Sequence, residues 1–251
     1  THLAPNKIYV IPPNRALTLS NGVLHLSLRK KVGSHLPIDH FFESLAQDQG
    51  NLAIGIVLSG NGHDGTAGLQ HIKASGGITF SQEPHSAKFP GMPESARSAD
   101  CVDSVLPPAS IAEELARIAR NRALKRVHHA SAETPLPGAE DHLHRIFSQL
   151  RLVTGVDFSH YKLTTLKRRI MRRMVLKKID HLSNYVAYLE KNAEEVELLF
   201  RDILINVTGF FLDSSAFQAL RRRIFPRLVK QRPADRPLRI WVPGCSTGEE
   251  A

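Results

Sequence analysis

The stretch NLAIGIVLSG, residues 51–60, constrains the fold of this chain more than any other. It is an uninterrupted apolar run that ends in glycine, which is typical of a parallel β-strand covered on both faces. TAGLQHIKASG, residues 66–76, then has helical spacing closed by glycine, and GITFSQ, residues 77–82, has the pattern of another short strand. The order strand, helix, strand predicts a βαβ unit, and hence an α/β fold with a parallel sheet.

Short strands and helices surround this unit. The turn Asn21-Gly22 joins two alternating runs at 16–20 and 23–29, which predicts a β-hairpin, and a further strand is expected at 7–13, interrupted by Pro12-Pro13. The remaining elements expected here are an amphipathic helix at 37–49, a short helix at 92–100, a small strand at 101–106 and a longer helix at 107–123.

The second half changes character. Helical periodicity dominates from residue 140 to 228 and predicts an all-α helical bundle, whereas 124–139 gathers Ser, Pro and Gly as linkers do. An apolar run, Leu238–Val242, predicts one more strand. The expected organisation is an α/β domain at 1–123, a linker at 124–139, a helical domain at 140–228 and the start of a second α/β domain at 229–251.

Composition bounds the class of protein. No apolar run approaches the length needed to cross a bilayer, and the first residues lack the basic and apolar regions of a signal peptide, so a cytoplasmic location is expected. Cys101 and Cys245 lie far apart and form neither a metal pair nor a disulfide framework, and the histidines show no ligand spacing, so no metal site is expected. The missing initiator Met and the end directly after a strand and turn suggest a piece of a longer chain.

Asp64 is the first candidate for chemistry. In LSGNGHDGTAGL, residues 58–69, glycines remove side chains where a strand hands over to a helix, and Asp64 falls at the carboxyl edge of the sheet, where ligands bind in doubly wound folds. A carboxylate there orients a histidine, ligates a metal, or caps the helix that starts near Thr66. Local chemistry alone favours the cap, and it favours a solvated role for the neighbouring His63.

The last residues leave two interpretations open. Gly244-Cys245-Ser246-Thr247-Gly248 fits G-x-S-x-G, the turn that exposes a serine nucleophile. A serine hydrolase of that kind requires a downstream Asp and His. The same small-residue turn after an apolar run is also where a nucleotide-like cofactor often binds.

A basic helix is the clearest electrostatic feature. Eight Lys and Arg residues lie between Lys162 and Lys178 with no acid among them, while Leu166, Ile170 and Met174 are spaced to face inward. A nucleic acid, an anionic membrane face and an acidic protein surface are the three partners that fit. Aromatic residues make up only 6% of the chain and no nucleic-acid motif is present, so nucleic acid is not expected.

GNGHDGTAGL, and AKFPGMPESARSAD about twenty residues later, resemble the C-terminal half of the CheB-type protein-glutamate methylesterases of bacterial chemotaxis. YVIPPNRALTL and LPIDHFFESLA match that family in order. The resemblance implies a doubly wound parallel sheet and hydrolysis of receptor glutamyl methyl esters by a Ser-His-Asp triad. Asp64 falls on the triad aspartate, and Met92 falls in a turn near the site. The family's serine and histidine precede residue 1, so no esterase activity is expected from these residues alone.

DILINVTGFFLDSSAFQAL and LRIWVPGCSTGEEA resemble the CheR-type receptor methyltransferases, and TGVDFSHYKLTTLKRRIMRRM resembles the opening of that family's helical domain. This similarity implies S-adenosylmethionine as cofactor, a Rossmann-like domain that begins with the last strand, and a cofactor loop around Ser246. By resemblance, Asn206, Thr208 and Glu250 fall on cofactor contacts. Leu212 departs from the family pattern, which has Arg after Phe210-Phe211.

The two resemblances together predict a bifunctional protein that methylates and demethylates chemotaxis receptors. Its basic helix would dock on the acid-rich receptor helix, without nucleic-acid binding or membrane insertion. The residues predicted to dock are Lys167, Arg168, Arg169, Arg172 and Arg173. A non-catalytic signalling adaptor that retains both folds is the alternative, and Leu212 favours it.

Overall fold

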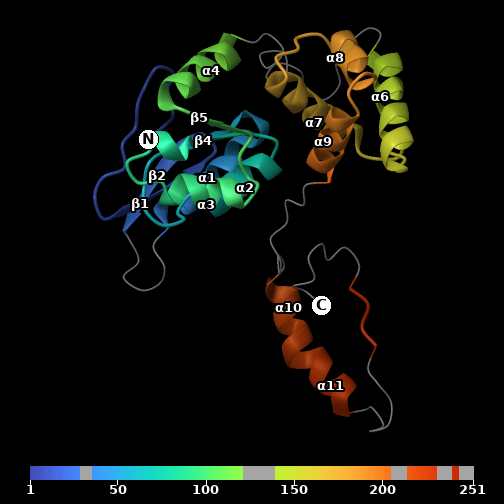
Figure 1. The fold of residues 1–251 in the computed structure, drawn as a ribbon. Helices are drawn as coiled ribbons and strands as arrows, with labels where there is room; N and C mark the ends of the chain where they lie inside the picture. The colour runs from blue at the N-terminus through green and yellow to red at the C-terminus, as the bar shows by residue number, and fades with distance from the viewer. Residues whose placement is uncertain (29–35, 121–138, 205–213, 231–238, 243–251) are drawn as a thin grey trace. The chain divides into compact units, whose positions relative to one another are not determined.

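The computed structural model describes residues 1–28, 36–120, 139–204, 214–230 and 239–242. The chain forms two compact units, Thr1–Ile205 and Asn206–Ala251 (Figure 1). Within the first unit, residues 1–120 are called the α/β part and residues 139–204 the helical part. The predicted linker lies outside the described residues except for Ala139, which begins a helix.

The chain opens with the predicted hairpin. Strands β1 (Arg15–Ser20) and β2 (Val23–Leu28) pair antiparallel, and Asn21 and Gly22 have φ of 50° and 70°, as a tight two-residue hairpin turn requires. The strand predicted at 7–13 is wrong: these residues have no regular structure. Pro12 and Pro13 lack the N–H that a sheet ladder needs, and β2 instead forms a bridge with His2.

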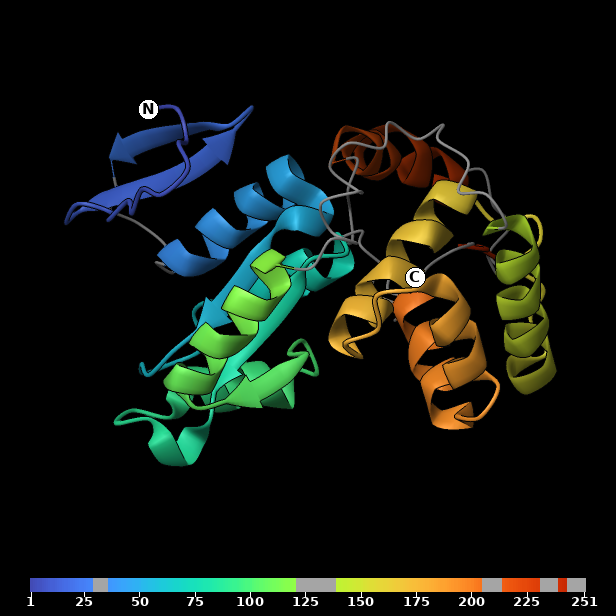
Figure 2. The ribbon, with the colours of Figure 1, turned by 90° about the horizontal axis from the view of Figure 1, so that it is seen from above.

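The hairpin packs beside helix α1 (Pro37–Gln49), as Figure 2 shows. Two side chains of that helix hold it there. The Ser44 hydroxyl accepts a hydrogen bond from Leu19 N at 3.0 Å, and the Asp48 carboxylate accepts from Gly22 N at 3.2 and 3.3 Å. The turn that the sequence predicts is therefore anchored by a helix about twenty-five residues later in the chain.

A parallel sheet forms the centre of the α/β part. Strands β3 (Ile54–Val57), β4 (Ile78–Gln82) and β5 (Ser104–Leu106) lie in the order β3-β4-β5, with all pairs parallel. Helix α2 (Thr66–Ala74) follows β3 and helix α3 (Gly91–Ser98) follows β4. The βαβ prediction is confirmed, and with it an α/β fold built on a parallel sheet.

Helices cover both faces of this sheet, which explains why every residue of β4 is buried. On one face Ile78 and Phe80 pack against Ile111 and Ile118 of helix α4 (Pro108–Arg120). On the other face Val57 packs against Leu69 of α2. Short 3₁₀ turns at Gly50–Leu52 and Pro84–Ser86 complete the connections.

The helical part contains the helices α6 (Ala139–Thr154), α7 (Leu163–Leu176), α8 (Leu182–Leu189) and α9 (Ala193–Ile203). They enclose one apolar core, and the prediction that Leu166, Ile170 and Met174 face inward is confirmed, since each is at most 4% exposed. Helix α6 ends before Gly155, whose φ of 74° suits a residue that terminates a helix.

The second unit is described at 214–230 and 239–242. Helices α10 (Ser214–Ala219) and α11 (Phe225–Lys230) continue one another through a π-helical turn, Leu220–Ile224. Pro226 lacks an N–H and its ring crowds the preceding turn, which accounts for the widened helix before it. The strand predicted at 238–242 is wrong for 239–242, which has no regular structure, because no described strand pairs with it.

No helix among the described residues is both long enough and apolar enough to cross a membrane.

Candidate functional site

Asp64 lies in the loop that leaves β3, at the carboxyl edge of the sheet. Gly62 and Gly65, with φ of 85° and 94°, let the chain turn sharply from the strand into α2. Asp64 itself is half-buried. The loop therefore presents one carboxylate at the edge where parallel sheets bind ligands.

The expectation that Asp64 caps the helix near Thr66 is wrong. Its two oxygens accept hydrogen bonds from the backbone N–H groups of Ile38, at 3.1 Å, and Asp39, at 2.9 Å, in the first turn of α1. That helix begins with Leu36 and Pro37, which offer no capping oxygen, so a carboxylate from another segment supplies it. Helix α2 starts instead from Gly65, without a side-chain cap at that residue.

Asp39 makes the reciprocal contact. Its Oδ1 accepts from the backbone N–H of Gly68, at 2.7 Å, in the first turn of α2. Burial raises the pKa of Asp39, and the charge of Asp64 raises it further, against the lowering effect of the backbone N–H groups of Gly68 and Gly65. Two helix N-termini and two carboxylates thus meet in one place. Asp64 accepts from the first turn of α1, which carries Asp39, and Asp39 accepts from the first turn of α2, which follows Asp64.

Asp64 keeps capacity for a further partner. An ionised carboxylate has about four acceptor positions, and the two backbone bonds of Asp64 use one on each oxygen. No histidine among the described residues hydrogen-bonds to it, and His63 next to it is exposed. A half-exposed carboxylate fixed by backbone donors has the geometry needed to orient an imidazole.

The start of helix α3, which carries Met92, packs against the same loop. Gly60 N donates to Phe89 O at 2.8 Å, and Met92 N donates to Gly60 O at 2.9 Å. A Cβ on Gly60 would lie 2.3 Å from Met92 Sδ, so any larger residue here requires the Met92 side chain to move. The predicted proximity of Met92 to the Asp64 loop is therefore present, and the carboxyl ends of β3 and β4 share one packed rim.

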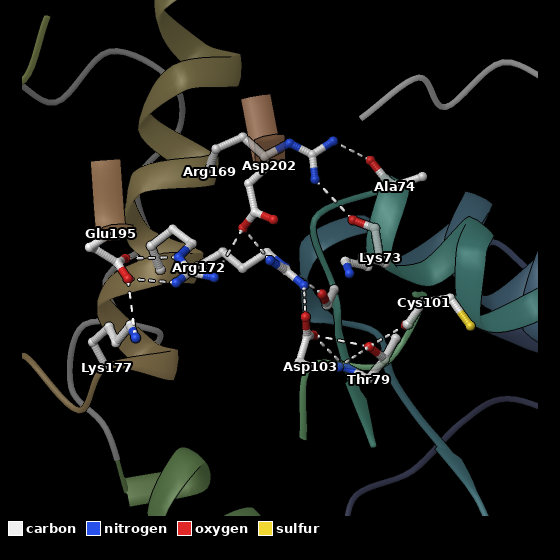
Figure 3. A network of polar contacts seen from close by, with 12 residues as sticks. Lys73, Ala74, Thr79, Cys101, Asp103, Arg169, Arg172, Lys177, Glu195 and Asp202 are labelled. Carbon is white, nitrogen blue, oxygen red and sulfur yellow. Dashed lines mark hydrogen bonds and ion pairs between the residues drawn. The ribbon is translucent and has the colours of Figure 1, made fainter. Parts of the chain in front are cut away.

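The five predicted docking residues on α7 divide into two groups. Arg169, Arg172 and Arg173 are buried, with 2%, 3% and 7% exposed, whereas Lys167 and Arg168 are half-buried. The expectation that these three arginines are exposed for docking is wrong, because acids and carbonyls from other elements surround them. Figure 3 shows these contacts.

Arg172 is the centre of this network. Its guanidinium donates to the carboxylates of Asp103, directly before β5, and Asp202, on α9, and its Nε donates to Gly77 O at 2.9 Å (Figure 3). The other oxygen of Asp103 accepts from Thr79 N at 2.9 Å and from the Thr79 hydroxyl at 3.0 Å. The buried cation is thus paired twice and also hydrogen-bonded, which is what burial of a charge requires.

Arg169 binds carbonyls instead of acids. Its two terminal nitrogens donate to Lys73 O, at 2.9 Å, and to Ala74 O, at the end of α2. Cations are favoured at the carboxyl end of a helix. Burial lowers the pKa of Arg169 to about 10, and the charges of Arg172 and Arg168 add to that effect.

Arg173 pairs within the helical part. It donates two hydrogen bonds to Glu195 of α9, at 2.9 and 2.7 Å, and the Tyr185 hydroxyl donates to the same carboxylate at 3.0 Å. Burial lowers the pKa of Arg173, but the hydrogen bonds and charge of Glu195 outweigh it and raise the pKa overall. Burial, followed by the Glu195 charge, raises the pKa of Tyr185. Lys177 also reaches Glu195, at 3.2 Å.

The predicted cofactor contacts Asn206, Thr208 and Glu250 lie outside the described residues, as do Leu212 and Ser246. Among the described residues no group of three or more His, Cys, Asp or Glu is placed to hold a metal ion.

Sequence reasoning missed the acids that neutralise α7. Asp202 and Glu195 share the buried face of α9 with Val196, Leu199 and Ile203. An acid at helical spacing on an apolar face is a signal of a buried cationic partner, and α7 offers the cations. Asp103 carried a weaker signal, a single acid inside the short strand-like run 101–106.

Three family models match the chain in succession. Residues 1–115 match the model described as CheB methylesterase. Residues 141–204 match the all-alpha domain of CheR methyltransferase, and residues 206–251 match the SAM binding domain of CheR methyltransferase. The chain therefore combines a segment similar to the methylesterases with a following segment similar to the methyltransferases.

Curated relatives agree with this division. A 104.1 kDa protein from the hypE 3′ region of Rhodobacter capsulatus is 36% identical over 99% of this chain and 28% of its own length. A protein-glutamate methylesterase/protein-glutamine glutaminase of Burkholderia pseudomallei is 37% identical over 46% of this chain and 33% of its own length. A chemotaxis protein methyltransferase of Listeria monocytogenes is 35% identical over 38% of this chain and 36% of its own length. The chain thus spans roughly a third of these relatives.

Among solved structures, the Thermotoga maritima CheB methylesterase catalytic domain is 28% identical, with a TM-score of 0.39, over 43% of this chain and 59% of that one. That TM-score is too low to show a common fold.

Proposed function

We propose that these residues belong to a bifunctional enzyme that hydrolyses glutamyl methyl esters and methylates glutamates on chemotaxis receptors in the cytoplasm. The order of the matched segments supports this function, because an esterase-like segment precedes both methyltransferase-like segments in one chain. The two opposing activities have a common logic if both act on the same glutamates.

The Asp64 site carries the proposal for the esterase. A serine attacks the ester carbonyl, and the bond to the methoxy group breaks as a histidine passes the serine proton to the departing methanol. Water then hydrolyses the acyl-enzyme, and Asp64 holds the histidine in the productive tautomer throughout. The two bonds from Ile38 N and Asp39 N fix the Asp64 carboxylate, so it enters the reaction already oriented. Its unused acceptor positions leave room for the imidazole N–H.

The methyltransferase proposal rests on the match at 206–251. S-adenosylmethionine supplies the methyl group, and Asn206, Thr208 and Glu250 are the proposed contacts to it. Glu250 is suited to the ligand's positive charge. On the docking helix, Lys167 and Arg168 are the residues proposed to meet an acid-rich receptor helix, because Arg169, Arg172 and Arg173 are buried in the first unit.

A matched pair of variants in the complete protein tests the esterase. Asp64→Asn should lower kcat for methanol release from a methylated receptor by about 10⁴-fold, as loss of the orienting charge does in a Ser-His-Asp triad. Asp48→Asn is the control, since Asp48 is also half-buried and also accepts a backbone N–H, from Gly22. If both variants lose activity equally, Asp64 has no special part in the reaction.

A non-catalytic adaptor is the second candidate, and Leu212 is the feature that favours it. Calorimetry of the complete protein with S-adenosylhomocysteine separates the two functions. Micromolar binding supports the methyltransferase, and the absence of binding supports the adaptor.

A further inference from the structure

Helix α7 belongs to the core of the helical part and to the core of the α/β part. Its inner residues Leu166, Ile170 and Met174 pack within the helical part. Val175, only 1% exposed, instead joins the cluster of Ile78 and Phe80 on β4, and Leu176 packs against the same cluster. The last turn of α7 therefore covers the sheet of the α/β part on the face where α4 lies.

Beside this apolar contact, two arginines of α7 hold the α/β part directly. Arg172 bridges Asp103 of the α/β part and Asp202 of the helical part, and its side chain is 1% exposed (Figure 3). Arg169 donates to the terminal carbonyls of α2 at Lys73 and Ala74. The side chain of Arg168 packs against Gly76, in the turn that follows α2.

A second polar contact closes the other end of the helix. Arg117 of α4 donates to Val175 O at 3.0 Å, near the carboxyl end of α7, and the same carbonyl also accepts from Lys178 N at 3.2 Å. Glu114 of α4 accepts from Arg117 and pairs with Lys178, at 2.5 and 2.6 Å. Although burial raises the pKa of Glu114, the hydrogen bonds from Lys178 and Arg117 lower it overall.

We propose that α7 is an interdomain clamp, whose Arg169 and Arg172 hold the α/β part on the helical part, so that most of its cationic face is occupied within the chain. The contact combines an apolar centre, Val175, with two buried arginines, of which Arg172 is paired with two acids and Arg169 is bound by two carbonyls. If the two parts did not pack against each other, Arg169 and Arg172 would lie in water, where a guanidinium group is better solvated than in a protein interior.

The clamp has a consequence for acidic partners. While the clamp is closed, a glutamate-rich helix has no access to Arg169 and Arg172, because both are buried. The basic residues that it meets are the exposed Lys162 and Lys178 and the half-buried Lys167 and Arg168. When the interface opens, Arg172 separates from Asp103, and Arg169 separates from the carbonyls of Lys73 and Ala74. Binding of such a helix and closure of the clamp therefore compete, and this competition is independent of both proposed catalytic activities.

Amide hydrogen exchange of the complete protein tests the clamp. In Arg172→Ala, exchange should accelerate both in α7 and in β4–β5, by roughly a hundredfold or more in the opening equilibrium, because Asp103 and Asp202 lose the cation between them. Asp103→Asn, a milder change, should shift both segments in the same direction. Arg145→Ala is the control, since Arg145 pairs with Glu190 at the surface of the helical part. If α7 accelerates while β4 and β5 do not, the clamp is refuted.

Binding of poly-glutamate tests the competition. Asp103→Asn should bind this probe at least about tenfold more tightly than Asp180→Asn, because loosening the clamp raises the fraction of molecules with a free cationic face. Asp180 is an exposed acid just beyond the end of α7, so its variant makes the same change in net charge. Equal affinities of the two variants would overturn the proposal that the clamp masks the helix.

Discussion

Two groups of carboxylates in the first unit have opposite fates. Asp64 is half-buried, is held only by backbone N–H groups and retains unused acceptor positions. The side chains of Asp103 and Asp202 are at most 7% exposed, and both pair with Arg172. The two groups carry the same chemistry, but only the first is free to act on a ligand.

The difference shows how the environment sets the role of an acid. A carboxylate fixed by neutral donors keeps its full charge for a further partner, so it is available to orient a cation that forms during a reaction. The charge of a carboxylate that faces a buried guanidinium is balanced by that cation, and removal of the carboxylate leaves the buried cation without its partner. Loss of Asp64 should therefore harm activity more than stability, and loss of Asp202 should harm stability.

The largest expected effect on stability is that of Asp202→Ala. This variant leaves Arg172 with one acid and also removes the charge 3.9 Å from Arg173, so the free energy of unfolding should fall by about 3–5 kcal/mol. Urea unfolding measures the change. Arg145→Ala, at an exposed ion pair, should cost at most about 1 kcal/mol. Similar losses in the two variants would contradict the structural role given to Asp202.

The next prediction tests the close approach between Gly60, in the loop that carries Asp64, and the Met92 side chain. Gly60→Ala forces a methyl group against Met92 Sδ and should lower the free energy of unfolding by about 1–3 kcal/mol. Adding Met92→Ala should recover part of this loss relative to Met92→Ala alone, as a double-mutant cycle of unfolding free energies measures. Strict additivity of the two changes would show that the close approach is unimportant.

A smaller effect is expected when the carboxylate of Asp64 is removed. Asp64→Ala leaves two N–H groups of α1 without their acceptor, which is the loss of a helix cap and should cost about 1 kcal/mol. Thermal and urea unfolding measure it alongside the esterase assay. A loss as large as that of Asp202→Ala would break the distinction between the two groups of acids.

The smallest effect concerns Asp39, whose pKa in the folded protein lies above the ordinary value of 3.8 because the carboxyl is partly buried. The folded protein holds this proton more tightly than the unfolded chain, so ionisation of Asp39 lowers stability as pH rises through the folded pKa. This penalty is absent below the unfolded pKa. Asp39→Asn keeps an oxygen for Gly68 N–H, so it should be slightly more stable than wild type at neutral pH and equal at low pH. A less stable variant at neutral pH in urea unfolding would contradict the sign.

Much of the fold was predictable because its signals are local. The hairpin turn Asn21-Gly22, the apolar run that became β3 and the inward face of α7 were each identified from spacing alone. The failures at 7–13 and 239–242 both concern strand pairing, although Pro12 and Pro13 prevent it in the first segment and no described strand pairs with the second. A strand requires a neighbour to pair with, and an apolar run does not say whether the neighbour is present.

The candidate sites were predictable only in part. The position of Asp64 at the edge of the sheet followed from the strand that precedes it. Its actual hydrogen-bond donors, Ile38 and Asp39, lie about twenty-five residues earlier in the chain, and no local pattern connects them to it. The basic face of α7 was identified correctly as a cluster, but its environment was not.

The sequence by itself determined most of the helices and strands, their order and the high density of positive charge on one helix, because these signals extend over only a few neighbouring residues. Only the tertiary structure decided which groups pair with those positive charges. Arg172 meets Asp103 across sixty-nine positions and Asp202 across thirty, and Arg169 meets Lys73 across ninety-six. Electrostatic pairing depends on distance in space, and only the folded chain brings these groups within reach.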